Sequence, residues 1–469
     1  MFEPGLDVRW AGVLVALPSL LVNGLLKFSK EHFFLPKGFY GLESLLVIFA
    51  FLALLRVKSL EKVQHFDPGE LGKLVGLDRI PEVKILREKL KILSQQGSPA
   101  DWSRELGRFW MEEDPGLAGI LYIDGHVRVY HGNQTALPKR YVAREKLCLR
   151  GVTDYWVNDS LGNPFFVVTQ TVNSGLLSVL EHEIIPRLLE DVPNQPTQEE
   201  LKVNKNLFRF AIVFDREGFS QIFFKKMLAL RIACYTYRKN VKDVWPESEF
   251  VETEVIFPNG EKAAMKLAER GLRYPDADIW VREIRKLKES GHQTSLVATD
   301  FLSDTARIAG SMFSRWSQEN FFKYMMEHYG IDRLIDYQLE KMDDTTKVVN
   351  PRHRELESQI RSRSAKLYRR KAEYGALIYG KEIDEKEIQG YVQKKAELIE
   401  VIEELEKEIQ PLKALKKDTK KHIPFSELPE AEKFKELKKN GKQFSDTIKM
   451  IAYRAETALV NVLRSYIPK

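Results

Sequence analysis

The sequence predicts an α/β protein in which a mixed sheet is flanked by helices, with a helical region before the sheet and a long helical hairpin after it. Short apolar runs bounded by turn residues fill the middle of the chain, which is typical of strands. Apolar residues spaced three and four apart on both sides of that stretch indicate helices. The 469 residues, 43% of them hydrophobic, are enough for about three compact units.

Residues 1–114 are expected to form the N-terminal helical region. Two uncharged runs in it, residues 11–26 and 44–55, are shorter than the ~20 residues that span a bilayer. We therefore expect two buried helices and no membrane partner. The alternative interpretation of these runs is a membrane-tethered coiled-coil protein.

Residues 67–93 carry the signals of two short helices. Asp67 and Pro68 are suited to the N-cap and the first position of a helix, and Gly76 is suited to the turn after it. A second, basic helix is expected from Pro81. The pair is either a helix-turn-helix that binds DNA or an ordinary helical hairpin.

The central region, residues 115–345, predicts three antiparallel strands, then a helix, a strand, a helix and a strand. The strands are expected at residues 120–130, 152–157, 165–171, 208–214 and 232–237, and the helices at residues 175–191 and 220–230. That order of elements is the order of an RNase H-like fold. Residues 240–300 interrupt it with a β-rich insertion that includes strand-like residues 252–257 and 279–284 and a turn at residues 258–260. One long helix follows over residues 305–329.

The C-terminal part is predicted to be helical. Over residues 346–425, apolar residues spaced three and four apart between dense charge predict two long helices joined near Gly380. We expect these helices to form an intrachain hairpin rather than an intermolecular coiled coil. Residues 426–469 are expected to end in one amphipathic helix.

Composition narrows the classes of function. The formal net charge is +6 with 30% of residues charged, which permits a polyanionic partner but does not require one. Cys148 and Cys234 lie in apolar strand-like runs and are expected to be buried thiols in a reducing compartment. The chain has no P-loop, G-x-G-x-x-G, G-x-S-x-G or H-E-x-x-H motif. P-loop hydrolysis, Rossmann oxidoreduction, serine hydrolysis and zincin proteolysis therefore have no support.

Three acidic residues lie where a metal-dependent phosphoryl transferase needs them. Asp124 lies inside the first predicted strand, Asp215 follows the fourth, and Glu319 lies on the helix after the insertion. In an RNase H-like sheet the first and fourth strands are neighbours, and a later helix supplies a third carboxylate. Two-metal catalysis needs carboxylates from different elements to hold divalent ions ~3.5–4 Å apart. These three residues are the candidate catalytic and metal-binding residues; the competing interpretation of Asp215 is a turn or cap residue.

Arg315, Glu319 and Lys323 are four residues apart and share one stripe of the predicted helix. On a solvated surface such a stripe would be a ladder of ion pairs worth about 0.3 kcal/mol each. Aromatic residues crowd both sides of the stripe, which indicates a helix sunk into the domain.

A rival interpretation of the first strand is a site for a single metal ion in another class of hydrolase. Asp124 and His126 are two apart in a strand and so share a face, and His131 is nearby. No further ligand spacing accompanies them.

Positive charge is gathered in several clusters. Arg238 and Lys239 follow a strand expected to end near Asp215, so this pair is the cluster expected to contact a DNA backbone. The other clusters are expected to lie on solvated helix faces where neighbouring glutamates offset them, for example at residues 361–370 and 413–421.

Three segments around the acidic residues resemble the three blocks of bacterial insertion-sequence DDE transposases: residues 121–126 (LYIDGH), 213–219 (VFDREGF) and 315–323 (RWSQENFFK). The similarity is to the branch with a β-rich insertion before the glutamate, whose glutamate helix carries a tyrosine, arginine, glutamate and lysine signature. Arg315 and Glu319 keep its spacing. The tyrosine position is Met312 and the lysine position is Met326, so Lys323 is taken as the substitute lysine.

The resemblance, which covers about residues 115–340, implies a DNA transposase that cleaves and joins phosphodiester bonds at the ends of a mobile element. Asp124, Asp215 and Glu319 would hold two Mg²⁺ or Mn²⁺ ions, and Arg315 and Lys323 would contact phosphate or orient Glu319. The implied partners are double-stranded DNA, at the element ends and the target, and further copies of the chain. The implied location is the bacterial cytoplasm, at the nucleoid. The alternative is a non-catalytic DNA-binding or scaffolding protein derived from such an enzyme.

Overall fold

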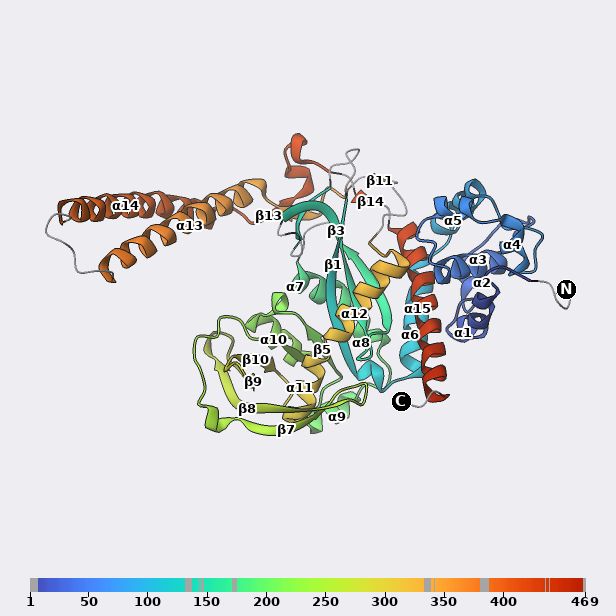
Figure 1. The fold of residues 1–469 in the computed structure, drawn as a ribbon, viewed down its shortest axis with the longest axis horizontal. Helices are drawn as coiled ribbons and strands as arrows, with labels where there is room; N and C mark the ends of the chain where they lie inside the picture. Colours follow the sequence, from blue (N-terminus) through green and yellow to red (C-terminus); the bar gives the residue numbers. More distant parts are fainter. Residues whose placement is uncertain are drawn as a thin grey trace. The chain divides into compact units, whose positions relative to one another are not determined.

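The computed structural model describes residues 7–130, 137–142, 145, 147–170, 175–332, 339–340, 342–379, 388–434, 436–437 and 439–466. The chain divides into two compact units (Figure 1). The first unit comprises Met1–Gly132, Pro138–Leu339 and Leu437–Lys469, and the second comprises Asn133–Leu137 and Glu340–Glu436. The N-terminal helices, the sheet and the C-terminal helix therefore belong to one unit, and the helical hairpin belongs to the other.

The first unit is built on a ten-stranded mixed sheet. Its strands are β1 (Ile120–Val129), β2 (Lys139–Val142), β3 (Leu147–Asn158), β4 (Pro164–Gln170), β5 (Phe210–Phe214), β6 (Ile232–Tyr237), β7 (Val251–Ile256), β8 (Lys262–Tyr274), β9 (Ile279–Leu287) and β10 (Gln293–Ala298). The strand order is β2-β3-β1-β5-β6-β10-β9-β8-β7, and β4 also pairs with β3.

The centre of the sheet combines antiparallel and parallel pairs. β3 pairs antiparallel with both β1 and β4, whereas β1, β5 and β6 run parallel to one another. A turn joins β3 to β4, in which the Asp159 carboxylate accepts hydrogen bonds from the backbone N–H groups of Leu161 and Asn163 at 2.9 and 2.8 Å. The first and fourth predicted strands, β1 and β5, are therefore neighbours, as expected.

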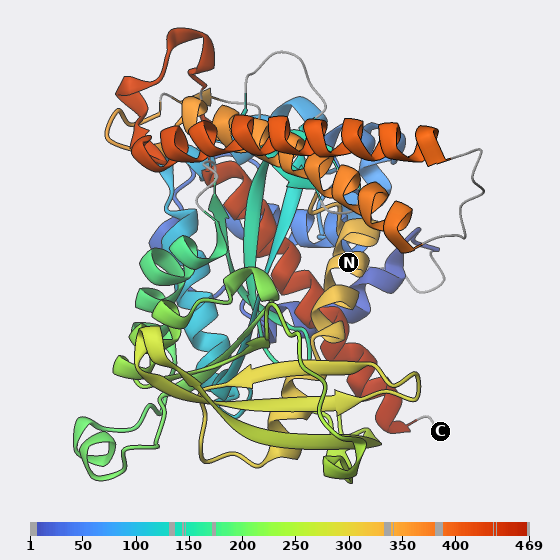
Figure 2. The same cartoon turned by 90° about the vertical axis from the view of Figure 1, so that its left-hand side faces the viewer.

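The strands of residues 240–300 extend the central sheet instead of forming a separate layer. β10 pairs antiparallel with β6, and β9, β8 and β7 follow in turn, each antiparallel to the one before. Figure 2 shows these yellow-green strands as one continuous curved layer. The predicted turn before β8 is present, with Gly260 at a φ of 82° that disfavours other residues. Strands β2, β8 and β10 were not predicted, because charged or polar residues interrupt their apolar alternation.

Helices cover both faces of the sheet. They are α1 (Leu17–Val22), α2 (Ser29–His32), α3 (Leu42–Leu54), α4 (Pro68–Lys73), α5 (Val83–Gln96), α6 (Pro99–Glu113), α7 (Leu176–Val179), α8 (Ile185–Asp191), α9 (Gln198–Val203), α10 (Gln221–Ala229), α11 (Thr305–Phe313), α12 (Trp316–Tyr324) and α15 (Asn440–Tyr466). Helix α10 packs in the cluster that contains Leu121 and Ile123 of β1. Helix α11 packs on the opposite face, in the cluster that contains Tyr122.

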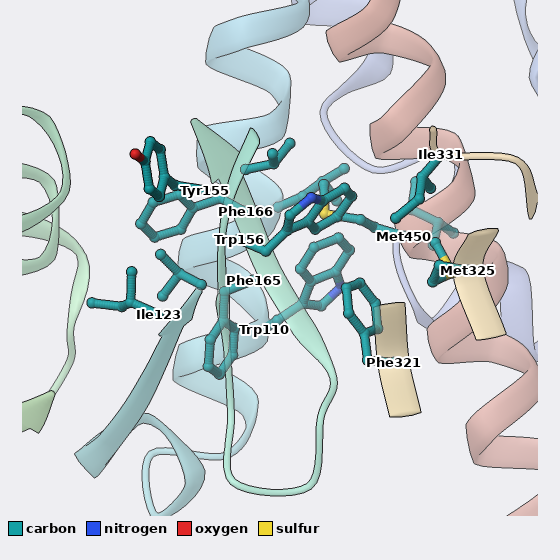
Figure 3. Close-up of a cluster of buried hydrophobic side chains, with 14 of the residues drawn as sticks. Trp110, Ile123, Tyr155, Trp156, Phe165, Phe166, Phe321, Met325, Ile331 and Met450 are labelled. Carbon is teal, nitrogen blue, oxygen red and sulfur yellow. The ribbon is translucent and has the colours of Figure 1, made fainter. Parts of the chain in front are cut away.

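The largest core cluster joins the N-terminal helices and α15 to the sheet. Figure 3 shows part of it, where Trp156 of β3, Phe165 of β4, Trp110 of α6, Phe321 of α12 and Met450 of α15 come together. All five side chains are at most 4% exposed. Segments from both ends of the chain therefore bury their apolar faces against the same strands.

The apolar N-terminal runs differ in burial. Helix α3, which spans nearly all of the second run, contributes eight buried residues, so the expected packed helix is present there. The first run forms a 3-10 helix, Ala11–Ala16, and the short α1; these two helices bury only Ala16 and Leu20, and Leu25, after α1, is also buried. Among the described residues, no helix combines the length and the apolar character needed to cross a bilayer.

Several local predictions need correction. The Asp67 N-cap and Pro68 are as predicted, but α4 ends at Lys73 and α5 begins at Val83, so no tight helix-turn-helix joins them. The expected single helix over residues 305–329 is interrupted at Ser314 and Arg315, where α11 ends and α12 begins. Cys234 is buried as expected, whereas Cys148 is exposed, because its strand runs on past the sheet's covered part.

The second unit contains a long helical hairpin. Helices α13 (Pro351–Tyr379) and α14 (Ile388–Asp418) pack against each other within the chain, as predicted. Strands β12 (Lys347–Val349) and β13 (His422–Pro424) pair at the base of the hairpin. The two-residue strands β11 (Leu339–Glu340) and β14 (Glu436–Leu437) form another small sheet. The predicted joint near Gly380 lies outside the described residues.

Candidate active site

Asp124 and Asp215 lie side by side on neighbouring parallel strands. The register of β1 and β5 pairs Tyr122 with Val213 and Ile123 with Phe214, so the next positions on the two strands are the two aspartates. Side chains alternate along a strand, so Asp124 and Asp215 project from the same face as Tyr122 and Val213. That face is the one covered by α11. Strand pairing therefore brings together two carboxylates that are 91 positions apart in sequence.

Arg315 binds both aspartates. Its Nη1 donates to Asp215 Oδ1 at 3.1 Å, and its Nη2 donates to Asp124 Oδ2 at 3.3 Å. The side chain of Arg315 is 10% exposed, whereas those of Asp124 and Asp215 are 26% and 50% exposed. Burial lowers the pKa of Arg315, but the charges of the two aspartates outweigh that effect and raise it. The guanidinium is thus a fixed positive charge between two carboxylates.

The break between α11 and α12 places Arg315 over the sheet. Arg315 is the N-cap residue of α12, directly after Ser314 ends α11. The amide of Gln318 holds the start of α12 against the sheet, because its Nε2 donates to the backbone oxygen of Tyr122 at 3.2 Å. A continuous helix would not turn at this point. The interruption that the sequence did not reveal is therefore part of how the site is assembled.

The Asp124 carboxyl group has a perturbed pKa. Removal from water is the main cause and the charges of Asp215 and Glu319 add to it, so that the net pKa rises from 3.8 to about 6. Arg315 and a hydrogen bond from the Gly125 N–H, at 2.8 Å, act in the opposite direction. A raised carboxyl pKa beside other carboxylates is typical of functional sites, where charges of one sign are held together.

Glu319 is the third predicted carboxylate. It is exposed in the first turn of α12, one helical turn after Arg315. Its charge raises the pKa of Asp124 and of Tyr237, at the end of β6, so it acts on the same site. Among the described residues, the only three ligand side chains whose atoms all lie within 4.8 Å of one another are Glu31, His32 and Glu105, in the N-terminal helices. The carboxylate oxygens of Asp124, Asp215 and Glu319 therefore do not all lie within 4.8 Å of one another.

The cap interpretation of Asp215 does not fit the structure. Asp215 is the N-cap residue of the 3-10 helix Arg216–Gly218, but its side chain makes no capping hydrogen bond. The Asp215 partner that the structure shows is Arg315, 100 positions later in the sequence. The carboxylate is therefore directed to the site rather than to its own turn.

The predicted basic residues have different surroundings. Lys323 is exposed on α12, one turn beyond Glu319. Arg238 lies just after β6 and donates to the buried Glu283 of β9 at 2.6 Å, so it already has an internal role. Lys239 approaches the loop after Asp215, with 3.4 Å between its Nζ and the backbone oxygen of Glu217. Of the pair expected to contact DNA, Lys239 is the residue that approaches the loop following Asp215.

The single-metal alternative is not supported at its described residues. His126 is 9% exposed and stacks on Phe322 of α12, with 5.6 Å between ring centroids and 25° between ring planes. Asp124 is engaged with Arg315. His131 lies outside the described residues.

Sequence reasoning missed two features of the site. Tyr237 lies near Arg315, with 6.0 Å from the guanidinium carbon to the ring centroid, and Gln318 anchors α12. Gln318 carried no clear signal, because it lies among the polar residues Ser317, Glu319 and Asn320. Tyr237 carried none, because a tyrosine that ends a strand is ordinary in sequence.

One comparison with known proteins shows the family of the chain. The chain matches over residues 1–469 a family described as "Transposase protein". A solved chain in the cryo-EM structure of the piggyBac transposase synaptic complex with hairpin DNA shares 12% identity, with a TM-score of 0.29. The match covers 69% of this chain and 66% of that one, slightly less than two thirds of its length. No curated protein matches the chain. The match over its full length shows that the chain belongs to a transposase family.

Proposed function

We propose that this transposase cleaves and joins phosphodiester bonds at the ends of a mobile DNA element by DDE-type, two-metal catalysis. Asp124, Asp215 and Glu319 are the proposed catalytic residues. One observation carries the proposal: two aspartates occupy adjacent register positions on parallel strands and share one guanidinium. That arrangement gathers negative charge on one face of the sheet, where a phosphoryl transferase needs it.

The strand arrangement supports an RNase H-like sheet. Three antiparallel strands, β4, β3 and β1, are followed across the sheet by β5 and β6, which are parallel to β1. Asp124 and Asp215 lie on the neighbouring strand positions of β1 and β5 in the middle of this arrangement, and α12 supplies the third carboxylate, Glu319. The insertion of β7 to β10 falls between the second and third carboxylates along the chain. Both features agree with the resemblance to insertion-sequence DDE transposases.

The donor set fits Mg²⁺ or Mn²⁺. Both ions prefer carboxylate oxygen ligands, and Asp124 and Asp215 already attract a cation, the Arg315 guanidinium. When bound, such ions would activate the attacking oxygen and stabilise the leaving oxygen of the phosphodiester. The half exposure of Asp215 and the exposure of Glu319 leave room for ligands and DNA to approach.

The chain's own residues would prepare the site. Asp124 must be ionised to hold a cation, and its raised pKa makes this step depend on pH near 6. Arg315 keeps the two aspartates aligned, and its buried position fixes the start of α12 that carries Glu319. Lys239 and Lys323, both near this face, are proposed to bind phosphate oxygens of the DNA. Two or more copies acting on two DNA ends, in the bacterial cytoplasm, complete the proposal.

Asp215→Asn tests the proposal. The substitution keeps the size of the side chain but removes a charge that a divalent ion needs, so nicking should fall by several orders of magnitude. The assay is Mg²⁺-dependent nicking of duplexes that carry the DNA flanking the coding sequence, with gel-shift binding on the same preparation. Binding should survive, because it depends on phosphate contacts elsewhere.

Asp276→Asn is the matched control, because Asp276 is an exposed carboxylate in the loop between β8 and β9. It should nick like the wild type. Unchanged nicking by Asp215→Asn would remove Asp215 from the active site. Absence of nicking by the wild type with binding retained would instead favour the non-catalytic DNA-binding protein.

A further inference from the structure

The two helices of the hairpin differ sharply in charge. Helix α13 contains eight Lys and Arg residues and three Glu residues, whereas α14 contains six Lys residues and seven acidic residues. The net charge is therefore +5 on α13 and −1 on α14, so the excess of positive charge lies on one helix. Positive charge gathered on one side of a protein can bind a polyanion, whereas the net charge of the whole chain does not show where such a partner would bind.

Part of the α13 charge is used within the second unit. Arg363 and Lys371 pair with Glu408 and Glu406 of α14. Both lie on the side of α13 that packs on α14, with Leu367 between them one turn from each. Three other arginines also have acidic partners: Arg352 with Glu355, Arg354 with Glu432 and Arg370 with Glu373.

Three basic residues lie on the other side of α13. At 100° per residue, Arg361, Lys366 and Arg369 are centred roughly opposite the stripe of Arg363, Leu367 and Lys371. All three side chains are exposed, and none forms an ion pair with a carboxylate of the described residues. Glutamates offset Arg363 and Arg370 of the cluster at residues 361–370, as expected, but they form no ion pair with these three residues within the described part of the chain. We call the side of α13 that these three residues share, from Glu355 to Glu373, the outer face of α13.

Most of the remaining outer face consists of small side chains, and it also carries Glu355 and Glu373, which pair with Arg352 and Arg370. Ser358, Ser362, Ala365 and Ala372 are exposed there and leave the backbone of the helix open to close approach. Stable protein interfaces have an apolar, often aromatic centre. The exposed aromatic Tyr368 lies only at the edge of this face, and serine and alanine residues occupy its middle. A polyanion with regularly placed charges is therefore a better partner for it than a second protein.

We propose that the outer face of α13 binds the phosphate backbone of duplex DNA. Arg361 and Arg369 are eight residues apart, roughly 12 Å along a helix, which is comparable to the ~12 Å width of the major groove of B-DNA. Cations at the two ends of the face can thus reach phosphates on both sides of that groove. Contacts of this type position DNA without reading its sequence. The proposal adds a second DNA-binding surface and does not require the carboxylates to be catalytic.

The test is the salt dependence of DNA binding by the full chain. Carrying Asp215→Asn in every protein and adding EDTA prevents cleavage, so only binding is measured, by fluorescence anisotropy on a duplex between 50 and 200 mM salt. Arg361→Gln, Lys366→Gln and Arg369→Gln are combined in one variant. Loss of three phosphate contacts should reduce the slope of log K against log salt by about 2.7. Between those salt concentrations, the wild-type affinity should fall about 40 times more than that of the variant.

A variant of α14 with the same change of charge is the control. Lys407→Gln, Lys413→Gln and Lys417→Gln remove three exposed cations from the same hairpin, and circular dichroism verifies the helical content of both variants. The control should keep the wild-type slope. Equal loss of slope in both variants would mean that only net charge matters, and no loss in the α13 variant would mean that this face does not contact DNA; either result overturns the proposal. A chain that binds DNA in this way but never nicks it would refute the proposed catalysis and leave this inference standing.

Discussion

Asp124→Asn should stabilise the protein at neutral pH in the absence of divalent ions. The folded state raises the pKa of this carboxyl from 3.8 to about 6, chiefly because it removes the group from water. A folded state with the higher pKa binds more protons than the unfolded state between pH 4 and 6, so its stability falls as the pH rises through that range. A shift of about 2 pKa units corresponds to about 3 kcal/mol. The side chain retains 26% exposure, so solvent screening makes that value an upper bound.

Asparagine resembles the protonated carboxyl and avoids this penalty. We expect the variant to exceed the wild type by up to about 3 kcal/mol in free energy of unfolding at pH 7.5, and the two proteins to converge near pH 4. The measurement is urea unfolding in EDTA at pH 4.5, 6.0 and 7.5. Added Mg²⁺ should narrow the difference at pH 7.5, because it binds the folded wild type more tightly than the variant.

Asp276→Asn, an exposed carboxylate of the same unit, should differ from the wild type by less than about 0.5 kcal/mol at every pH. If Asp124→Asn were as stable as the wild type or less stable at pH 7.5 in EDTA, the Asp124 charge would be stabilising in the fold. The carboxylate would then be a structural partner of Arg315, and the reasoning that places it in a destabilised, cation-seeking site would be wrong.

Two further variants test the surroundings of the site. Arg315→Gln leaves Asp124 and Asp215 without their shared cation, so the free energy of unfolding at pH 7.5 in EDTA should fall by about 1–3 kcal/mol. Urea unfolding measures this loss, and added Mg²⁺ should restore part of it. No loss of stability would show that Arg315 does not hold the aspartates. Asp159→Ala removes a buried carboxylate that accepts hydrogen bonds from Leu161 and Asn163 in the turn between β3 and β4. The free energy of unfolding, measured in the same way, should fall by about 2–4 kcal/mol. The pH dependence attributed to Asp124 should not change.

Local chemistry explains which elements were predictable. Strands β1, β4, β5, β6 and β9 have apolar runs bounded by turn residues, and each lies within a few residues of its predicted position. The N-cap at Asp67 follows from its residue type, because a cap needs only its own side chain and the next turn. Strands β8 and β10 were not predicted, because pairing with neighbouring strands, rather than their own apolar pattern, holds them in the sheet.

The sequence by itself determined the identity of the candidate carboxylates, since Asp124, Asp215 and Glu319 stand out by residue type and by their place relative to predicted elements. Only the tertiary structure decided what surrounds them. It set the register that aligns two aspartates, the break before α12 that brings Arg315 to both, and the packing of α13 on α14 that leaves three cations on the outer face. The physical reason is the distance along the chain over which each kind of interaction acts. Helix and turn preferences act over a few neighbouring residues, whereas pKa, burial and ion pairing depend on groups about 100 positions away, which only the folded chain brings together.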